Sequence, residues 1–438
     1  MGDDGQNRDI FRYVLIGLFC GIAVLAVIVF ANIQAGTGSG REQFGDVEIW
    51  GTRDRSAMLD LFKLIEDDVP GIGRVNYTQM DPRNFYNTFL EAAAVGRAPD
   101  MLLVDQSNLY LFADKSIAIP FENFPEQQYR SLYVEAAEVF IRGDGVIGIP
   151  FMIDPMVMFW NRDMFTNAGI SQPPAYWDDF LPLTRQLNRV DNNLNILKST
   201  VAFGEAANIN NFKEIFSLLM LQTGTRITSW NRDQELVATL RGVQTGGEPA
   251  GVATLRFFTD FSNPSSQTYS WNRSLPEARA AFTAGDLAVY FGRLSELPTI
   301  TRLNPNLNYA IALAPQVRGT ERRVTYAHVD AFVIPRASRN SGGAYGLAVR
   351  LSTPEVQLRL AQSFGLPPLR RDLLAQRQSE QYWSVAYDSA IIARTWLDPN
   401  PQATSEIFRR MIESVKSGEL TVSAAVSRAE AEMGVVRR

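Results

Sequence analysis

The stretch DVEIWGTRDRSAMLDLF, residues 46–62, joins a strand pattern to a helix pattern. The segment VEIW at residues 47–50 predicts a short strand. Apolar residues then recur every three or four positions, as on one face of a helix: Met58, Leu61, Phe62 and Ile65. A strand that leads directly into a helix is the first half of a β-α-β unit.

The same alternation continues along the chain. Residues 75–77 form a second strand pattern, and Asp81-Pro82 has the composition of a helix start, with the helix running to about residue 95. The loop at residues 96–100 leads into a buried strand at residues 101–104. Strands that alternate with helices predict an α/β fold with a largely parallel sheet covered on both faces.

Length and composition exclude several classes of protein. At 438 residues the chain is long enough for two or three folding units, and it can bury a core without disulfides. The net charge of −5 argues against nucleic-acid binding, which needs a basic face. With a single cysteine, Cys20, and a single histidine, His328, neither an internal disulfide nor a structural zinc site is expected.

The N-terminal region contains an uncharged apolar run. The sequence YVLIGLFCGIAVLAVIVFAN, residues 13–32, has the length that spans a bilayer core, about 30 Å. Arg8 and Arg12 precede it, which favours a cytoplasmic N-terminus. We therefore expect residues 1–12 in the cytoplasm, a transmembrane anchor at 13–33, a flexible Gly/Ser tether at 34–43 and an extracytoplasmic remainder.

A cleaved signal peptide is the competing interpretation of this run. Its apolar region would be about 7–15 residues long and would end at a small-x-small site. The run here is longer, and residues 33–35 fit such a site poorly. A lipidation site would have small residues just before its cysteine, but Leu18 and Phe19 precede Cys20, so we expect an ordinary membrane-buried residue.

The glycine pattern at residues 143–148, GDGVIG, matches G-x-G-x-x-G, the spacing of a dinucleotide site. Apolar residues on both sides of Asp144-Gly145 instead indicate a two-residue β-hairpin turn. No helix pattern opens after Gly148, as the nucleotide motif requires. We expect a hairpin and no cofactor at this position.

Several segments, taken in order, resemble the extracellular solute-binding protein family 1, the maltose-binding-protein-like group. These segments lie at residues 96–101 (GRAPDM), 148–151 (GIPF), 159–165 (FWNRDMF), 168–170 (AGI), 173–180 (PPAYWDDF), 282–289 (FTAGDLAV) and 365–371 (GLPPLRR). The resemblance extends over about 44–435. Tyr176 stands where the family usually has Thr, and Trp160 where Tyr is usual, which leaves the identity of the ligand open.

The resemblance implies a type II periplasmic-binding-protein-like fold, in which two α/β lobes joined by a hinge close over a ligand. We expect lobe one to comprise residues 44–152 and 291–328, and lobe two to comprise residues 153–290 and 329–438. Three segments would then cross between the lobes, near residues 151–155, 288–292 and 328–332.

A sugar ligand needs polar side chains for its hydroxyls and aromatic rings for its C–H faces. In open α/β sheets such groups lie at the carboxyl ends of strands. The predicted ligand-binding residues at strand ends, crossings and lobe two are Trp50, Arg53, Asp54, Asp105, Gln106, Phe151, Asp154, Trp230, Trp271, Arg293, Tyr326, His328 and Asp330. The alternatives are core packing for the tryptophans, capping of the next turn for Asp105, a solvated loop charge for Arg53 and a hydrogen-bonded hinge position for His328.

The resemblance implies a monomeric binding protein that delivers a small solute, a carbohydrate, to the permease subunits of an ABC importer. No catalytic residue, cofactor or metal is expected, since the sequence lacks a G-x-S-x-G elbow and has one histidine for any triad. Binding of a polyamine or phosphate ester, or a sensory role beside a membrane receptor, would use the same fold. A paired-carboxylate hydrolase is a further alternative to which no motif points.

Overall fold

The computed structural model describes residues 45–64, 74–143, 145–193, 195–233, 235–245, 247–376 and 378–436. The predicted membrane anchor at 13–33 and the tether at 34–43 lie outside these ranges. Within them, every helix is too short or too polar to cross a bilayer.

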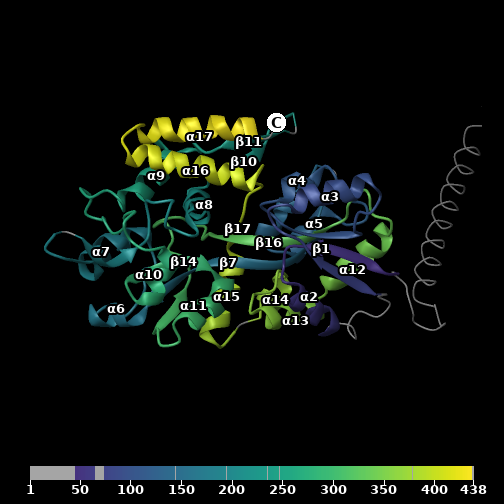
Figure 1. Ribbon diagram of the computed structural model, residues 1–438, viewed down its shortest axis with the longest axis horizontal. Helices are drawn as coiled ribbons and strands as arrows, with labels where there is room; N and C mark the ends of the chain where they lie inside the picture. Colours follow the sequence, from purple (N-terminus) through teal and green to yellow (C-terminus); the bar gives the residue numbers. More distant parts are fainter. Residues whose placement is uncertain are drawn as a thin grey trace, which may run out of the picture.

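A ten-stranded mixed sheet runs through the molecule in the order β2-β1-β3-β16-β7-β14-β9-β8, with β15 added to β7 and β17 (Ala393–Arg394) to β16 (Figure 1). Its centre is β7 (Ile149–Asn161), a strand of 13 residues that are all buried. A continuous apolar run of this kind is expected where both faces of a sheet are covered. The first half of β7 pairs with β16 (Thr325–Val333), and the second half pairs with β14 (Leu287–Arg293).

Lobe one surrounds the β16 side of the sheet. Its parallel strands β1 (Val47–Gly51), β2 (Val75–Gln79) and β3 (Met101–Asp105) confirm the predicted strand–helix alternation. Its main helices are α2 (Arg55–Leu64), α3 (Phe85–Ala94), α4 (Leu109–Ala113), α5 (Glu126–Leu132), α12 (Ser341–Leu351), α13 (Pro354–Phe364) and α14 (Arg371–Leu374), with the 3₁₀ helix η2 (Glu135–Phe140).

Lobe two surrounds the β14 side. Its remaining sheet strands are β8 (Arg189–Val190), β9 (Ile196–Val201) and β15 (Tyr309–Ala312). Its helices are α6 (Arg162–Asn167), η3 (Trp177–Asp179), α7 (Phe180–Leu187), α8 (Phe212–Gln222), α9 (Ala250–Asp260), α10 (Ala278–Ala284), η4 (Leu294–Glu296) and α11 (Leu297–Leu303). Near the C-terminus, α16 (Pro401–Lys416) and α17 (Val422–Val436) form an antiparallel pair against α8 and α9, drawn in yellow in Figure 1.

Two predicted lobe boundaries are wrong. Residues 291–328 were expected in lobe one, but β15, which lies within them, pairs with the lobe-two half of β7. Residues from 329 onward were expected in lobe two, but β16 pairs with β3, and α12 and α14 pack in lobe one. Later in this segment, α15 (Gln381–Ile391) contacts both α14 of lobe one and β15 of lobe two, and α16 and α17 lie in lobe two. Figure 1 shows α12 beside β1, far from α6 and α10.

The glycine-rich turn at 143–148 is a hairpin, as predicted, although Asp144 itself lies outside the described residues. Strand β5 (Ile141–Arg142) pairs antiparallel with β6 (Gly145–Val146), which also pairs with β4 (Ile119–Pro120). A Cβ at Gly145 would lie 2.4 Å from the carbonyl oxygen of Ile119, so the close approach of these strands requires glycine. After Gly148 the chain enters β7 rather than a helix.

Candidate functional site

A cleft between the lobes forms at the carboxyl end of β3 and along β16. Two adjoining hollows of about 510 and 200 Å³ share Phe212, Pro401 and Ser405. Lobe one lines the cleft with Pro82, Arg83, Ser107 and Asn108, and β16 with Tyr326 and His328. Lobe two contributes Asn210, Phe212, Lys213, Glu214, Asp398, Pro401, Gln402, Ser405, Glu406 and Arg409.

His328 links the two lobes at the inner end of the cleft. Its Nδ1 lies 2.8 Å from Oδ2 of Asp105 at the end of β3, and its Nε2 lies 3.5 Å from Oε1 of Glu214 on α8. Burial alone would lower the pKa of His328, but these two carboxylates raise it to about 10. The imidazole is therefore a cation at neutral pH. The pKa of Asp105 is lowered because His328 and the hydrogen bonds from Ser107 outweigh its burial.

Arg53 and Asp330 form a second ion pair beside the crossing strands, with 2.6 Å between Nη2 and Oδ2. Burial raises the pKa of Asp330, and the charge of Arg53 opposes that shift. Next to this pair, buried Gln106 accepts a hydrogen bond from the backbone N–H of Val329 and donates one to Tyr326 Oη. These predicted residues fasten β16 to lobe one, which fixes the floor of the cleft.

Lys213 and Asp398 form a third ion pair, inside lobe two. Nζ of Lys213 lies 2.5 Å from Oδ2 of Asp398 and 2.7 Å from Oγ1 of Thr404. Burial raises the pKa of Asp398, and the ammonium group of Lys213 opposes that shift. Both charged groups line the inner hollow, so the ligand would meet an ion pair rather than a lone charge.

Asp154 and Arg293 lie close together where β7 and β14 pair: Arg293, the last residue of β14, is opposite Met156 of β7. Asp154 accepts hydrogen bonds from the backbone N–H of Ser295 at 3.0 Å and from its hydroxyl at 2.6 Å. The buried Nε of Arg293 has no hydrogen-bond partner among the described residues. Burial alone would lower the pKa of Arg293, but the carboxylates of Asp154 and Glu296 raise it. The Nε–H of Arg293 is therefore an unused hydrogen-bond donor at the place where β7 and β14 pair.

Two predicted residues lie away from the cleft, on the first strand and the turn after it. Trp50 donates a hydrogen bond from Nε1 to Glu48 at 2.7 Å, on the outward face of β1. Asp54 is exposed and accepts the backbone N–H of Ala57 at 3.0 Å, at the start of α2. Hydrogen bonds from Ser56 and Ala57 lower its pKa. Asp54 therefore acts as a helix cap.

Phe151 and Trp271 correct the predicted site. Phe151 packs against Phe332 with ring centroids 4.6 Å apart, and Trp271 donates a hydrogen bond to Asn208 inside lobe two. Each side chain is 1 % exposed. Neither ring has a face left for a ligand, because neighbouring core residues already cover it.

Trp230 also lies outside the cleft lining. It ends β10 (Ile227–Trp230), and its ring lies 6.4 Å from that of Tyr110 on α4 of lobe one. The guanidinium of Arg142 lies 5.6 Å from the ring centre of Trp230. The residue predicted to stack on a ligand thus contacts the opposite lobe.

The sequence prediction missed the lobe-two wall of the cleft. Glu214 and Lys213 lie in the first turn of α8, and Asp398 precedes α16. A signal for the second helix was present: Asn400-Pro401 is an N-cap followed by proline at the first helical position. Nothing in that pattern indicates that the helix would begin at the ligand cleft.

The cleft offers mainly polar contacts. Its buried cations are matched by carboxylates, and its aromatic surface comes from Phe212 and Tyr326. Among the described residues, no group of three His, Cys, Asp or Glu side chains could hold a metal ion. Such a surface suits reversible binding of a polar molecule with little net charge.

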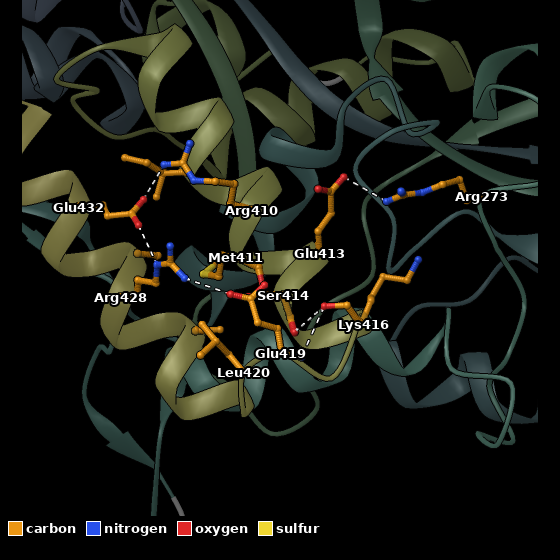
Figure 2. A pocket seen from close by; sticks show the side chains of 14 residues that line it. Arg273, Arg410, Met411, Glu413, Ser414, Lys416, Glu419, Leu420, Arg428 and Glu432 are labelled. Atoms are coloured by element: carbon orange, nitrogen blue, oxygen red, sulfur yellow. Dashed lines mark hydrogen bonds and ion pairs between the residues drawn. The ribbon is translucent and has the colours of Figure 1, made fainter.

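A separate hollow of about 490 Å³ lies between α16 and α17 (Figure 2). Its charged side chains pair with one another: Arg410 and Arg428 bind Glu432, and Arg273 binds Glu413. These pairs connect the two helices to each other and to lobe two. We interpret this hollow as part of the helix packing.

The chain is similar to known binding proteins in sequence and in fold. A protein of Brucella abortus (strain 2308) described as a binding protein is 20% identical over 357 residues, 81% of each chain. An ABC transporter solute-binding protein from Thermotoga lettingae TMO, bound to alpha-D-tagatose, superposes with a TM-score of 0.64 at 20% identity, covering 90% of this chain and all of the other.

Two further solved structures share the fold. The cyclic alpha-maltosyl-1,6-maltose binding protein from Arthrobacter globiformis has a TM-score of 0.71 at 15% identity, covering 90% and 98% of the two chains. The GacH receptor of Streptomyces glaucescens has a TM-score of 0.65 at 18% identity, covering 89% and 97%. The family model described as bacterial extracellular solute-binding protein matches residues 61–386, more than half of the chain. The chain therefore belongs to the bacterial extracellular solute-binding protein family.

Proposed function

We propose that this protein captures a neutral sugar or oligosaccharide between its lobes and delivers it to the permease of an ABC importer. The observation that carries the proposal is the cleft itself, a polar groove with walls from both lobes and a floor formed by the crossing strand β16. The relatives that bind tagatose, cyclic maltosyl-maltose and acarbose support the choice of a carbohydrate.

The pairing of charges favours a neutral ligand. Lys213 already binds Asp398, and His328 already contacts Asp105 and Glu214. An anionic ligand would have to displace a carboxylate from one of these cations and leave a largely buried carboxylate without its counterion, which costs several kcal/mol. Hydroxyl groups can instead accept from and donate to these residues without breaking the pairs.

A calorimetric screen of the purified full-length chain against mono- and oligosaccharides tests the proposal. A sugar at 100 times its Kd should raise the free energy of unfolding by about 2.7 kcal/mol. Stabilisation by polyamines or phosphate esters, with no response to any sugar, would contradict the carbohydrate assignment.

A pair of matched variants tests the location of the site. Ser405 lines both hollows of the cleft, so Ser405→Phe should fill the groove and weaken sugar binding at least about tenfold, the equivalent of about 1.4 kcal/mol. The same change at exposed Ser265, on the surface of lobe two, is the control and should leave the affinity unchanged. Equal affinities of both variants would place the ligand elsewhere.

We also propose that residues 13–33 anchor the protein in the membrane beside its importer. The length of that apolar run supports this, since about 20 residues span a bilayer. Cell fractionation should recover the full-length chain, at its unprocessed mass, with the membranes. A shortened chain in the soluble fraction would instead identify the run as a cleaved signal peptide.

A further inference from the structure

The hairpin formed by β10 and β11 (Leu236–Thr239) extends from lobe two to α4 of lobe one, and Figure 1 shows the two strands close to that helix. Trp230 is the last residue of β10. Its ring is tilted by 37° to that of Tyr110, and the guanidinium of Arg142 also lies near the ring. Arg142 is in turn paired with Asp114 at 2.8 Å, which keeps its charge in place.

The entry to this hairpin has an unusual backbone. Ile227 is buried with φ of 61°, the one positive φ at a non-glycine position among the described residues. A β-branched side chain in this region is strained and persists only where its surroundings impose it. Here the next residue, Thr228, donates from its hydroxyl to the carbonyl of Leu397 at 2.7 Å. The strain and this bond fix the direction in which Trp230 projects.

We propose that Trp230 is a clasp between the lobes, which engages Tyr110 and Arg142 when the cleft closes and so sets how long a ligand stays bound. This inference rests on the proposed binding function. Trp230 does not line the cleft, and its ring contacts Tyr110 and Arg142 of lobe one. Trp230 therefore acts on closure rather than on ligand recognition.

Aromatic pairs and cation–π contacts at partly exposed sites each contribute modestly. Opening the cleft separates Trp230 from both partners, so their loss should speed opening for every ligand to the same extent. Trp230→Ala and Tyr110→Ala should each raise the dissociation rate by about 2- to 10-fold and leave the association rate and the ranking of sugars unchanged. Trp230→Phe, which keeps a ring, should restore most of the wild-type rate.

The double variant is the decisive measurement. If the two rings act on each other, Trp230→Ala with Tyr110→Ala should be no faster in dissociation than the worse single variant. Leu303→Ala, at an exposed position at the end of α11 in lobe two, is the control and should not change the rate. Independent, multiplicative effects, or a changed ranking of sugars, would overturn the clasp.

A ligand-free measurement separates this inference from the proposed function. Spin labels on cysteines introduced at exposed Val95 in lobe one and Leu197 in lobe two, in a Cys20→Ser background, report the distance between the lobes. Trp230→Ala should shift that distance distribution to larger values without any sugar. If no sugar binds but the distance increases, the carbohydrate proposal fails and the clasp stands. If sugars bind while distance and dissociation rate stay unchanged, the clasp fails.

Discussion

His328 contacts a carboxylate from each lobe, Asp105 on one side and Glu214 on the other. The pattern of the sequence places a histidine at a crossing strand but gives no sign of Glu214, because α8 lies more than 100 residues earlier in the chain. The charge of an imidazole depends on its neighbours, and only the structure shows that Asp105 and Glu214 both contact His328.

The stability of the protein should fall as pH rises through the alkaline range because of His328. Its pKa is raised to about 10 from an ordinary value of 6.5, so the folded state binds more protons than the unfolded state between these values. The contribution is complete below about pH 6.5 and is lost as pH approaches 10, with a slope of at most about 1.4 kcal/mol per pH unit. Urea unfolding at several pH values measures it.

His328→Gln is the matched variant for that experiment. Glutamine keeps hydrogen-bonding groups but cannot carry the charge, so the variant should be less stable at pH 6.5 and should lose less stability between pH 6.5 and 10. Parallel curves for the two proteins would contradict the ion-pair assignment of His328.

The tryptophans show what a local pattern leaves undetermined. Trp50, Trp230 and Trp271 had the same predicted role, yet one lies on an outer face, one meets the opposite lobe and one is buried. An aromatic residue near a strand end can lie in any of these three positions, because its position depends on which element packs against it.

At the scale of elements, the start of α16 connects stability with the cleft. Asn400 caps this helix by accepting the backbone N–H of Ala403 at 3.0 Å, and the first two turns place Pro401, Gln402 and Ser405 in the cleft wall. Asn400→Ala should lower the free energy of unfolding by about 1 kcal/mol and weaken sugar binding. Asn400→Ser, which can still cap the helix, should retain most of the stability and most of the sugar affinity. Equal losses in the two variants would contradict the capping role. Thermal unfolding measures the stability of the variants, and calorimetry measures their sugar affinity.

Strand existence was predictable, whereas strand partners were not. The apolar runs that became β1, β3 and β14 are evident in the sequence, and so is the turn before β6. The lobe boundaries were misplaced because a buried run such as Leu287–Arg293 can pair on either edge. Here it joins β7 and β9, which keeps the following α11 and β15 in lobe two.

At the scale of the molecule, the sheet makes the lobes interdependent. Strands β7 and β16 lie side by side where the two lobes join. The chain passes from lobe one to lobe two, back to lobe one and finally to α16 and α17 in lobe two. Neither lobe is a continuous segment, so removing either would expose the buried faces of β7. We therefore expect the lobes to unfold as one cooperative unit rather than as two domains.

Urea unfolding followed by two probes tests this expectation. Trp50 lies in lobe one and Trp383 lies on α15, which contacts both lobes. The other tryptophans lie in the lobe-two segments and their C-terminal extension: Trp160, Trp177, Trp230, Trp271 and Trp396. Fluorescence therefore reports mainly on lobe two, while far-ultraviolet circular dichroism reports on the helices of both. Coincident transitions are expected for a cooperative unit, and a bound sugar should move both midpoints by the same amount. Separate midpoints, or a sugar that moves only one, would show that the lobes are independent and that the shared strand does not couple them.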